Sequence, residues 1–187
     1  MERKKMAHAI GLIAWGYLFL YFNLNLGSLN LIPSWVGYLL MGKAIKELKE
    51  ASPAMGLLGP LCILLAALEL WFWALTLIGI NNQHYLLQLL SLLLAVAALY
   101  FHFQLLTNLV EALGRAGETW RKELLNLRTV RTVLAAVMAL PVLWKEHFSV
   151  TVILAIAGVL VGISISAVLF WIRNAFLKSL CPAEEKE

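Results

Sequence analysis

The chain has 187 residues, of which 61% are hydrophobic, and its mean hydropathy is +0.81. Soluble globular domains are about 45–50% apolar, so a water-soluble fold of this length could not bury the excess. The net charge is +4, but the cations lie at the ends of apolar stretches, which leaves no basic face for nucleic acid.

Six apolar stretches follow one another along the chain, and we interpret them as transmembrane helices. A hydrocarbon core about 30 Å thick requires about 20 apolar residues per helix. The predicted spans are residues 7–26, 31–45, 55–80, 85–106, 132–144 and 148–172. Together they predict an all-α, polytopic bundle of six transmembrane helices that forms a single integral membrane domain over residues 1–187.

A polar segment separates the fourth and fifth predicted spans. Residues 118–131 place Trp120, Leu124 and Leu127 on one helical face, with basic side chains away from it. This pattern is typical of an amphipathic helix that lies on a membrane surface. Every lysine and arginine except Lys145 falls on one side of the spans, which predicts that both termini are cytoplasmic.

Glu69 is the main candidate for a functional side chain. It lies near the middle of the third predicted span, where a charge costs about 2.5–3.5 kcal/mol on insertion scales. We therefore expect Glu69 to face the bundle interior or to be protonated, and no lysine or arginine is expected at its depth. Matching the depths of the spans predicts a ligand or ion site formed by Glu69, Tyr17, Tyr21, Asn23, Gln88 and Ser91.

Histidines offer another interpretation. Of the four, His8 and His102 fall toward the inner side, and His84 and His147 toward the outer side. One pair in each leaflet could ligate two haems, as in an electron carrier. A solvated helix end is the simpler account of His102, since Gln104 and further polar residues follow it.

Small residues in the last predicted span and the absence of known motifs narrow the functions that remain possible. Gly158, Gly162 and Ser166 form a ridge at helical spacing that allows a close helix contact, within the bundle or with a second copy. The chain has no Asp, no His-Glu-x-x-His sequence and no phosphate-binding loop. These absent motifs give no support for an enzyme, and apart from the di-haem interpretation no cofactor or metal site is expected.

The first two predicted spans resemble known sequences. The segment Asn23-Leu-Asn25-Leu-Gly27, followed by Asn30-x-x-Pro33 and Gly37-Tyr38, resembles a pattern in small bacterial multipass membrane proteins that have no established activity. The resemblance implies a protein of the bacterial inner membrane. Gly37 is expected to let the first span approach the second closely.

Two hypotheses follow from these observations. The first is a membrane protein that binds or transports a small solute or cation through a polar site around Glu69. The second is a non-catalytic membrane subunit or regulator, which would bind a partner membrane protein or a second copy through residues 118–131 and the small-residue ridge. A di-haem carrier is the minor alternative.

Overall fold

The computed structural model describes residues 3–21, 25–26, 29–30, 33–79, 85–114, 118–139 and 148–178. Within these residues the chain forms six α-helices and one short pair of strands. The helices are α1 (Arg3–Tyr21), α2 (Ser34–Leu48), α3 (Pro53–Leu77), α4 (Tyr85–Leu113), α5 (Glu118–Met138) and α6 (Phe148–Lys178). The strands β1 (Asn25–Leu26) and β2 (Leu29–Asn30) pair in antiparallel register.

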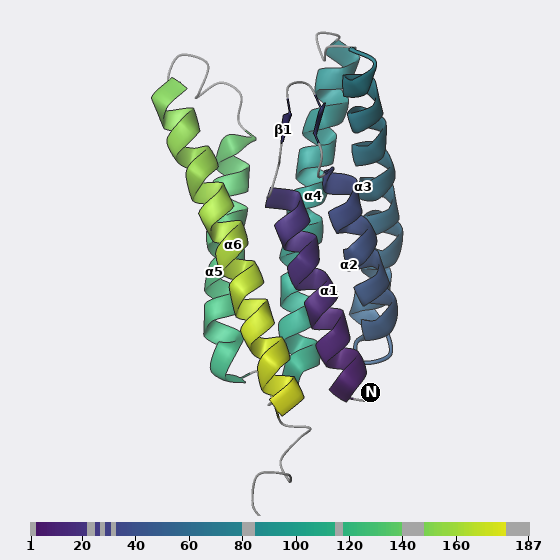
Figure 1. Ribbon diagram of the computed structural model, residues 1–187, viewed down its shortest axis with the longest axis vertical. Helices are drawn as coiled ribbons and strands as arrows, with labels where there is room; N and C mark the ends of the chain where they lie inside the picture. Colours follow the sequence, from purple (N-terminus) through teal and green to yellow (C-terminus); the bar gives the residue numbers. More distant parts are fainter. Residues whose placement is uncertain are drawn as a thin grey trace, which may run out of the picture.

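The helices form a closed ring in chain order. Each helix packs against its predecessor and its successor in sequence, and α6 returns to pack against α1. Figure 1 shows α1 and α4 between the α2–α3 pair and the α5–α6 pair, with the β1–β2 ladder at the end opposite the N-terminus. Large apolar side chains fill the ring, among them Ile13, Met41, Phe101 and Leu105, all fully buried.

Three of the helices, rather than six, are long and apolar enough to cross a membrane within the described part of the chain. They are α3, α4 and α6. Their outward faces carry exposed large apolar side chains such as Ile63, Leu93 and Ile156, a surface suited to lipid rather than to water. Of the six expected spans, these three have the length and composition of a membrane-spanning helix.

Length and charge explain why α1, α2 and α5 lack the character of a membrane-spanning helix. Helix α2 has 15 residues and is about 22 Å long, which is shorter than a hydrocarbon core. Helix α1 begins with three basic residues, and the first half of α5 carries most of its charges. These helices lie in the same ring as the three apolar ones, but composition alone does not mark them as spans.

Two predicted boundaries are wrong. Residues 118–131 are not a separate surface helix, because they form the first part of α5, which continues without a break to Met138 and packs against α4 and α6. No glycine or proline interrupts this stretch, so nothing ends the helix there. Helix α1 ends at Tyr21 rather than at residue 26, since Asn25 and Leu26 pair as a strand. Asparagine favours such non-helical backbone.

Two glycines set the distance between α1 and α2. A Cβ atom added at Gly37 would lie 2.7 Å from the carbonyl oxygen of Gly16, and one at Gly16 would lie 2.9 Å from that of Gly37. The backbones therefore meet directly at this point. This close approach brings Tyr17 and Tyr38, the next residues of each helix, into the centre of the ring.

We predict that Gly37→Ala lowers the thermal unfolding temperature of the protein in detergent. The added methyl group meets a backbone oxygen that cannot move alone, and overpacking of this kind costs about 1–3 kcal/mol. Gly59→Ala is the matched control, because a Cβ there has no neighbour within 4 Å. Equal unfolding temperatures for the two variants would show that α1 and α2 are not in close contact.

Candidate functional site

A buried histidine lies at the centre of the ring. His102, on α4, is 1% exposed and is flanked by two tyrosines from neighbouring helices. Its Nδ1 lies 3.2 Å from the hydroxyl oxygen of Tyr17 on α1, and its Nε2 lies 3.3 Å from that of Tyr38 on α2. Both tyrosines are buried as well. One imidazole thus joins three helices through hydrogen bonds.

Aromatic and thiol contacts hold the three rings in place. The Phe101 ring packs edge-on against His102, with 5.1 Å between the ring centroids, and also against Tyr38 at 5.8 Å. The Cys62 thiol on α3 donates a hydrogen bond of 3.1 Å to the carbonyl oxygen of Tyr38. Four consecutive helices, α1 to α4, therefore contribute to one interior cluster.

The chemistry of a neutral imidazole decides how the hydrogens are shared. It has one donor nitrogen and one acceptor nitrogen, so one tyrosine donates to His102 and the other accepts from it. The accepting tyrosine retains its own hydroxyl hydrogen, for which no acceptor is present among the described residues. Reversing the tautomer reverses the direction of the whole chain of hydrogen bonds. The cluster can therefore pass a proton or hold a polar ligand at either end.

Glu69 lies on the bundle-facing side of α3. The buried positions of that helix include Leu58, Cys62 and Leu65, and Glu69 follows Cys62 by two helical turns on the same stripe. Its side chain is partly buried. Glu69 thus lies about 10 Å along α3 from the Cys62 thiol that bonds to Tyr38.

A basic side chain also lies deep in the bundle. Arg131 of α5 is about 20 Å along the helix from Glu118. Its Nε donates a hydrogen bond of 2.9 Å to the Tyr21 hydroxyl, and its guanidinium carbon lies 5.9 Å from the centre of the Tyr17 ring. The expectation that no cation reaches this depth is therefore wrong. It rested on ending the polar helix at residue 131, whereas α5 carries Arg131 into the ring.

The predicted site residues are only partly brought together. Tyr17 belongs to the histidine cluster, Glu69 lies two helical turns along α3 from Cys62 of that cluster, and Tyr21, one turn after Tyr17 on the same face of α1, contacts Arg131. Ser91 is exposed and its hydroxyl donates to the carbonyl oxygen of Gln88, which is also exposed. Asn23 lies outside the described residues.

The inner histidines have different surroundings. His8 is exposed and its Nδ1 lies 2.9 Å from a carboxylate oxygen of Glu47, at the end of the bundle that carries the N-terminus. His102 is in the core, which corrects the expectation of a solvated helix end, and both of its ring nitrogens face tyrosines. His84 and His147 lie outside the described residues. The structure therefore does not place His8 beside His102.

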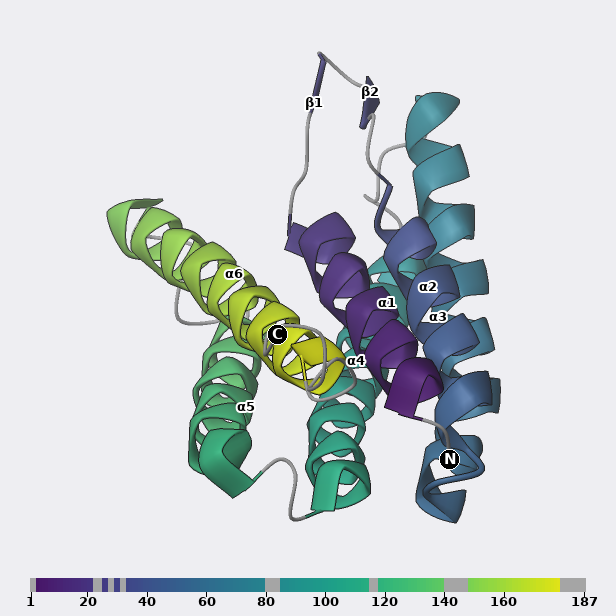
Figure 2. The same ribbon diagram turned by 60° about the horizontal axis from the view of Figure 1, so that its bottom comes forward.

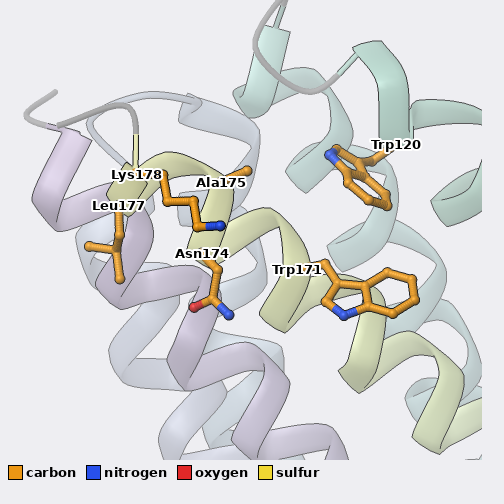
Figure 3. Close-up of a pocket in the computed structure, with 6 residues that line it drawn as sticks. All are labelled: Trp120, Trp171, Asn174, Ala175, Leu177 and Lys178. Atoms are coloured by element: carbon orange, nitrogen blue, oxygen red, sulfur yellow. The ribbon is translucent and has the colours of Figure 1, made fainter. Parts of the chain in front are cut away.

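A shallower hollow occurs where α5 begins and α6 ends. It is lined mainly by Trp120, Trp171, Asn174 and Lys178 and has a volume of about 480 Å³. Figure 3 shows the two indole rings on one side of it and the polar side chains farther along α6. The ring centroids of the two tryptophans are 5.9 Å apart. Paired indoles beside a lysine are typical of a membrane–water boundary.

Sequence reasoning missed His102, Tyr38 and Arg131 as members of the site. A signal was present for Arg131, since no helix breaker follows Gly117 until Pro141. For Tyr38 and His102 the signal was weaker. Their partners lie far away in sequence, and only the packing of α1, α2 and α4 brings them together. Comparison with protein-family models, curated proteins and solved structures gave no match, so the geometry alone carries the functional argument.

We predict that Tyr38→Phe lowers the stability of the protein, because it removes the partner of the buried Nε2 of His102. Leaving a buried polar atom without a partner costs about 1–3 kcal/mol, although hydrogen bonds between membrane helices average about 0.6 kcal/mol. Tyr100→Phe is the control, since Tyr100 is 54% exposed on the same helix as His102. Thermal unfolding in detergent measures both, and an equal loss would contradict the role given to the Tyr38 hydroxyl.

Proposed function

We propose that this protein binds or transports a small solute or cation, in exchange for a proton carried by Glu69 and the Tyr38–His102–Tyr17 cluster. The buried histidine between two tyrosine hydroxyls is the observation that carries the proposal. Polar and ionisable groups at such depth are costly, and in membrane proteins they commonly mark ion pathways and proton relays.

The proposed path runs across the ring. A proton on the Tyr17 side passes to Nδ1 of His102 while Nε2 releases its proton to the Tyr38 hydroxyl, which then serves the Glu69 side. Each step breaks one O–H or N–H bond and forms another, and the net charge of the cluster stays the same. Glu69, when ionised, would neutralise a cation next to Tyr38. Binding of the cation and protonation of Glu69 would thus exclude one another.

The proposed setting is the bacterial inner membrane, with all six helices in the bilayer and both termini in the cytoplasm. The described basic side chains support this orientation. Lys46, at the end of α2, and Lys178, at the end of α6, lie at the same end of the bundle as the N-terminus (Figure 1). An excess of lysine and arginine on one side is typical of the cytoplasmic face.

A non-catalytic membrane subunit is the second candidate. The side chains of Arg121, Lys122 and Glu123 are exposed at the start of α5 and form a charged surface that a partner protein could contact. The small-residue ridge favours this candidate less. Ser166 is buried, and a Cβ atom at Gly162 would overlap the Tyr21 ring, so this face of α6 packs against α1.

We predict that protein reconstituted in liposomes exchanges Na⁺ for protons under an imposed pH gradient, and that Glu69→Gln lowers this flux at least about tenfold, because an amide can neither ionise nor relay a proton. An internal pH dye measures protons, and ²²Na⁺ measures sodium. Glu47→Gln is the matched control, since Glu47 pairs with His8 at the surface.

Two results would contradict the proposal. One is a flux through the unaltered protein that equals that of protein-free liposomes. The other is a flux that Glu69→Gln leaves unchanged while the variant folds normally. In either case, co-purification of a stoichiometric partner from native membranes would favour the subunit hypothesis.

A further inference from the structure

A second interior feature lies next to the histidine cluster, one helical turn farther along α1. A cavity of about 300 Å³ opens between α1, α4, α5 and α6. Arg131 and Tyr21 are its polar side chains, and the others that line it are apolar, among them Leu134, Ala135 and Met138. Figure 2 shows why the space exists, since α6 crosses the bundle obliquely and diverges from α1 toward its Phe148 end.

The guanidinium of Arg131 is not fully satisfied by the protein. Its Nε donates to Tyr21, but its Nη1 is buried and has no hydrogen-bond partner among the described residues. In the same described part of the chain, no carboxylate pairs with Arg131. Arg131 is half-buried, and a buried guanidinium nitrogen without a partner is unfavourable, which points to an acceptor that comes from outside the chain.

We propose that this cavity binds an anionic amphiphile, with its carboxylate or phosphate on Arg131 and its acyl chain along the apolar wall. Guanidinium matches the geometry of both anions and forms strong, charge-assisted hydrogen bonds with them. The volume corresponds to roughly ten groups of the size of a water molecule, enough for a headgroup and the first part of a chain.

The position of the opening selects an amphiphile over a free anion. Met138 lines the cavity and is 42% exposed, so the cavity reaches the outer surface of the bundle. Close by, Val133 on α5 and Leu160 on α6 are exposed apolar side chains. A ligand that enters here comes from the lipid phase. A free anion would have to leave water and cross this apolar surface before it reached Arg131.

The site is distinct from the proposed transport path, because its ligand contacts are Arg131 and the α5–α6 wall rather than Glu69 or His102. Arg131 does lie over the Tyr17 ring, at 5.9 Å from its centre. A bound anion would therefore compete with that ring for the guanidinium. Binding itself can be measured without any transport assay, so the test of this cavity does not depend on the test of the transport path.

The test uses the full chain purified in an uncharged detergent, with oleate as the probe and native mass spectrometry as the measurement. We expect one oleate per chain, and binding of oleyl alcohol at least about tenfold weaker, because the alcohol lacks the charge that Arg131 recognises. Inorganic phosphate is expected to bind at least tenfold more weakly than oleate. Equal binding of oleate and its alcohol would overturn the proposal, as would phosphate binding as tight as that of oleate.

Matched variants place the ligand in the cavity. Ala135→Leu fills the space while it leaves the charge of the guanidinium unchanged, and it is expected to lower oleate affinity at least about tenfold. Ala136 is the next residue and is exposed, so Ala136→Leu should bind oleate as the unaltered chain does. Arg131→Gln should lose the preference for oleate over the alcohol. Equal oleate affinity for the two leucine variants would overturn the assignment even if Arg131→Gln failed to fold.

Discussion

The interior of this bundle is organised by the need to satisfy a buried imidazole. His102 has no water to bond with, so each of its nitrogens requires a partner from the protein. Tyr17 and Tyr38 supply these partners from two other helices. That requirement fixes the rotation of α1, α2 and α4 relative to one another. The Gly16–Gly37 contact satisfies this requirement, because the close approach of the α1 and α2 backbones brings both tyrosine hydroxyls to the imidazole ring of His102.

Two polar sites with opposite charge preference result from this packing. On one side of the histidine, α3 presents Glu69 along the stripe that begins with its buried apolar residues. On the other side, α5 presents Arg131 to Tyr21 and Tyr17. The acid suits a cation and the guanidinium suits an anion.

The sequence alone was sufficient for the helices and insufficient for their contacts. Apolar runs and turn residues placed all six helices, with the ends of most of them within a few residues. Periodicity failed at α5, where a polar first half and an apolar second half suggested two elements although nothing breaks the backbone between them. Hydropathy also failed to predict that His102 is buried, because a histidine near a helix end has the same hydropathy whether water or two tyrosines surround it. Glu69 could be found because a lone acid in an apolar run is conspicuous. Arg131 was missed because it belongs to a run of other charges, although the unbroken sequence from Glu118 to Met138 indicated that the helix continues past it.

The order of the helices around the ring bears on how the protein is made. Most helix contacts join elements that are consecutive in sequence, so each new helix finds its main partner already made. The seam between α1 and α6 is the exception, because it forms only when the last helix is complete. Until then, the side of the bundle that carries Tyr21 and Arg131 has no wall from α6. The cavity beside the guanidinium is therefore the last part of the bundle to take shape.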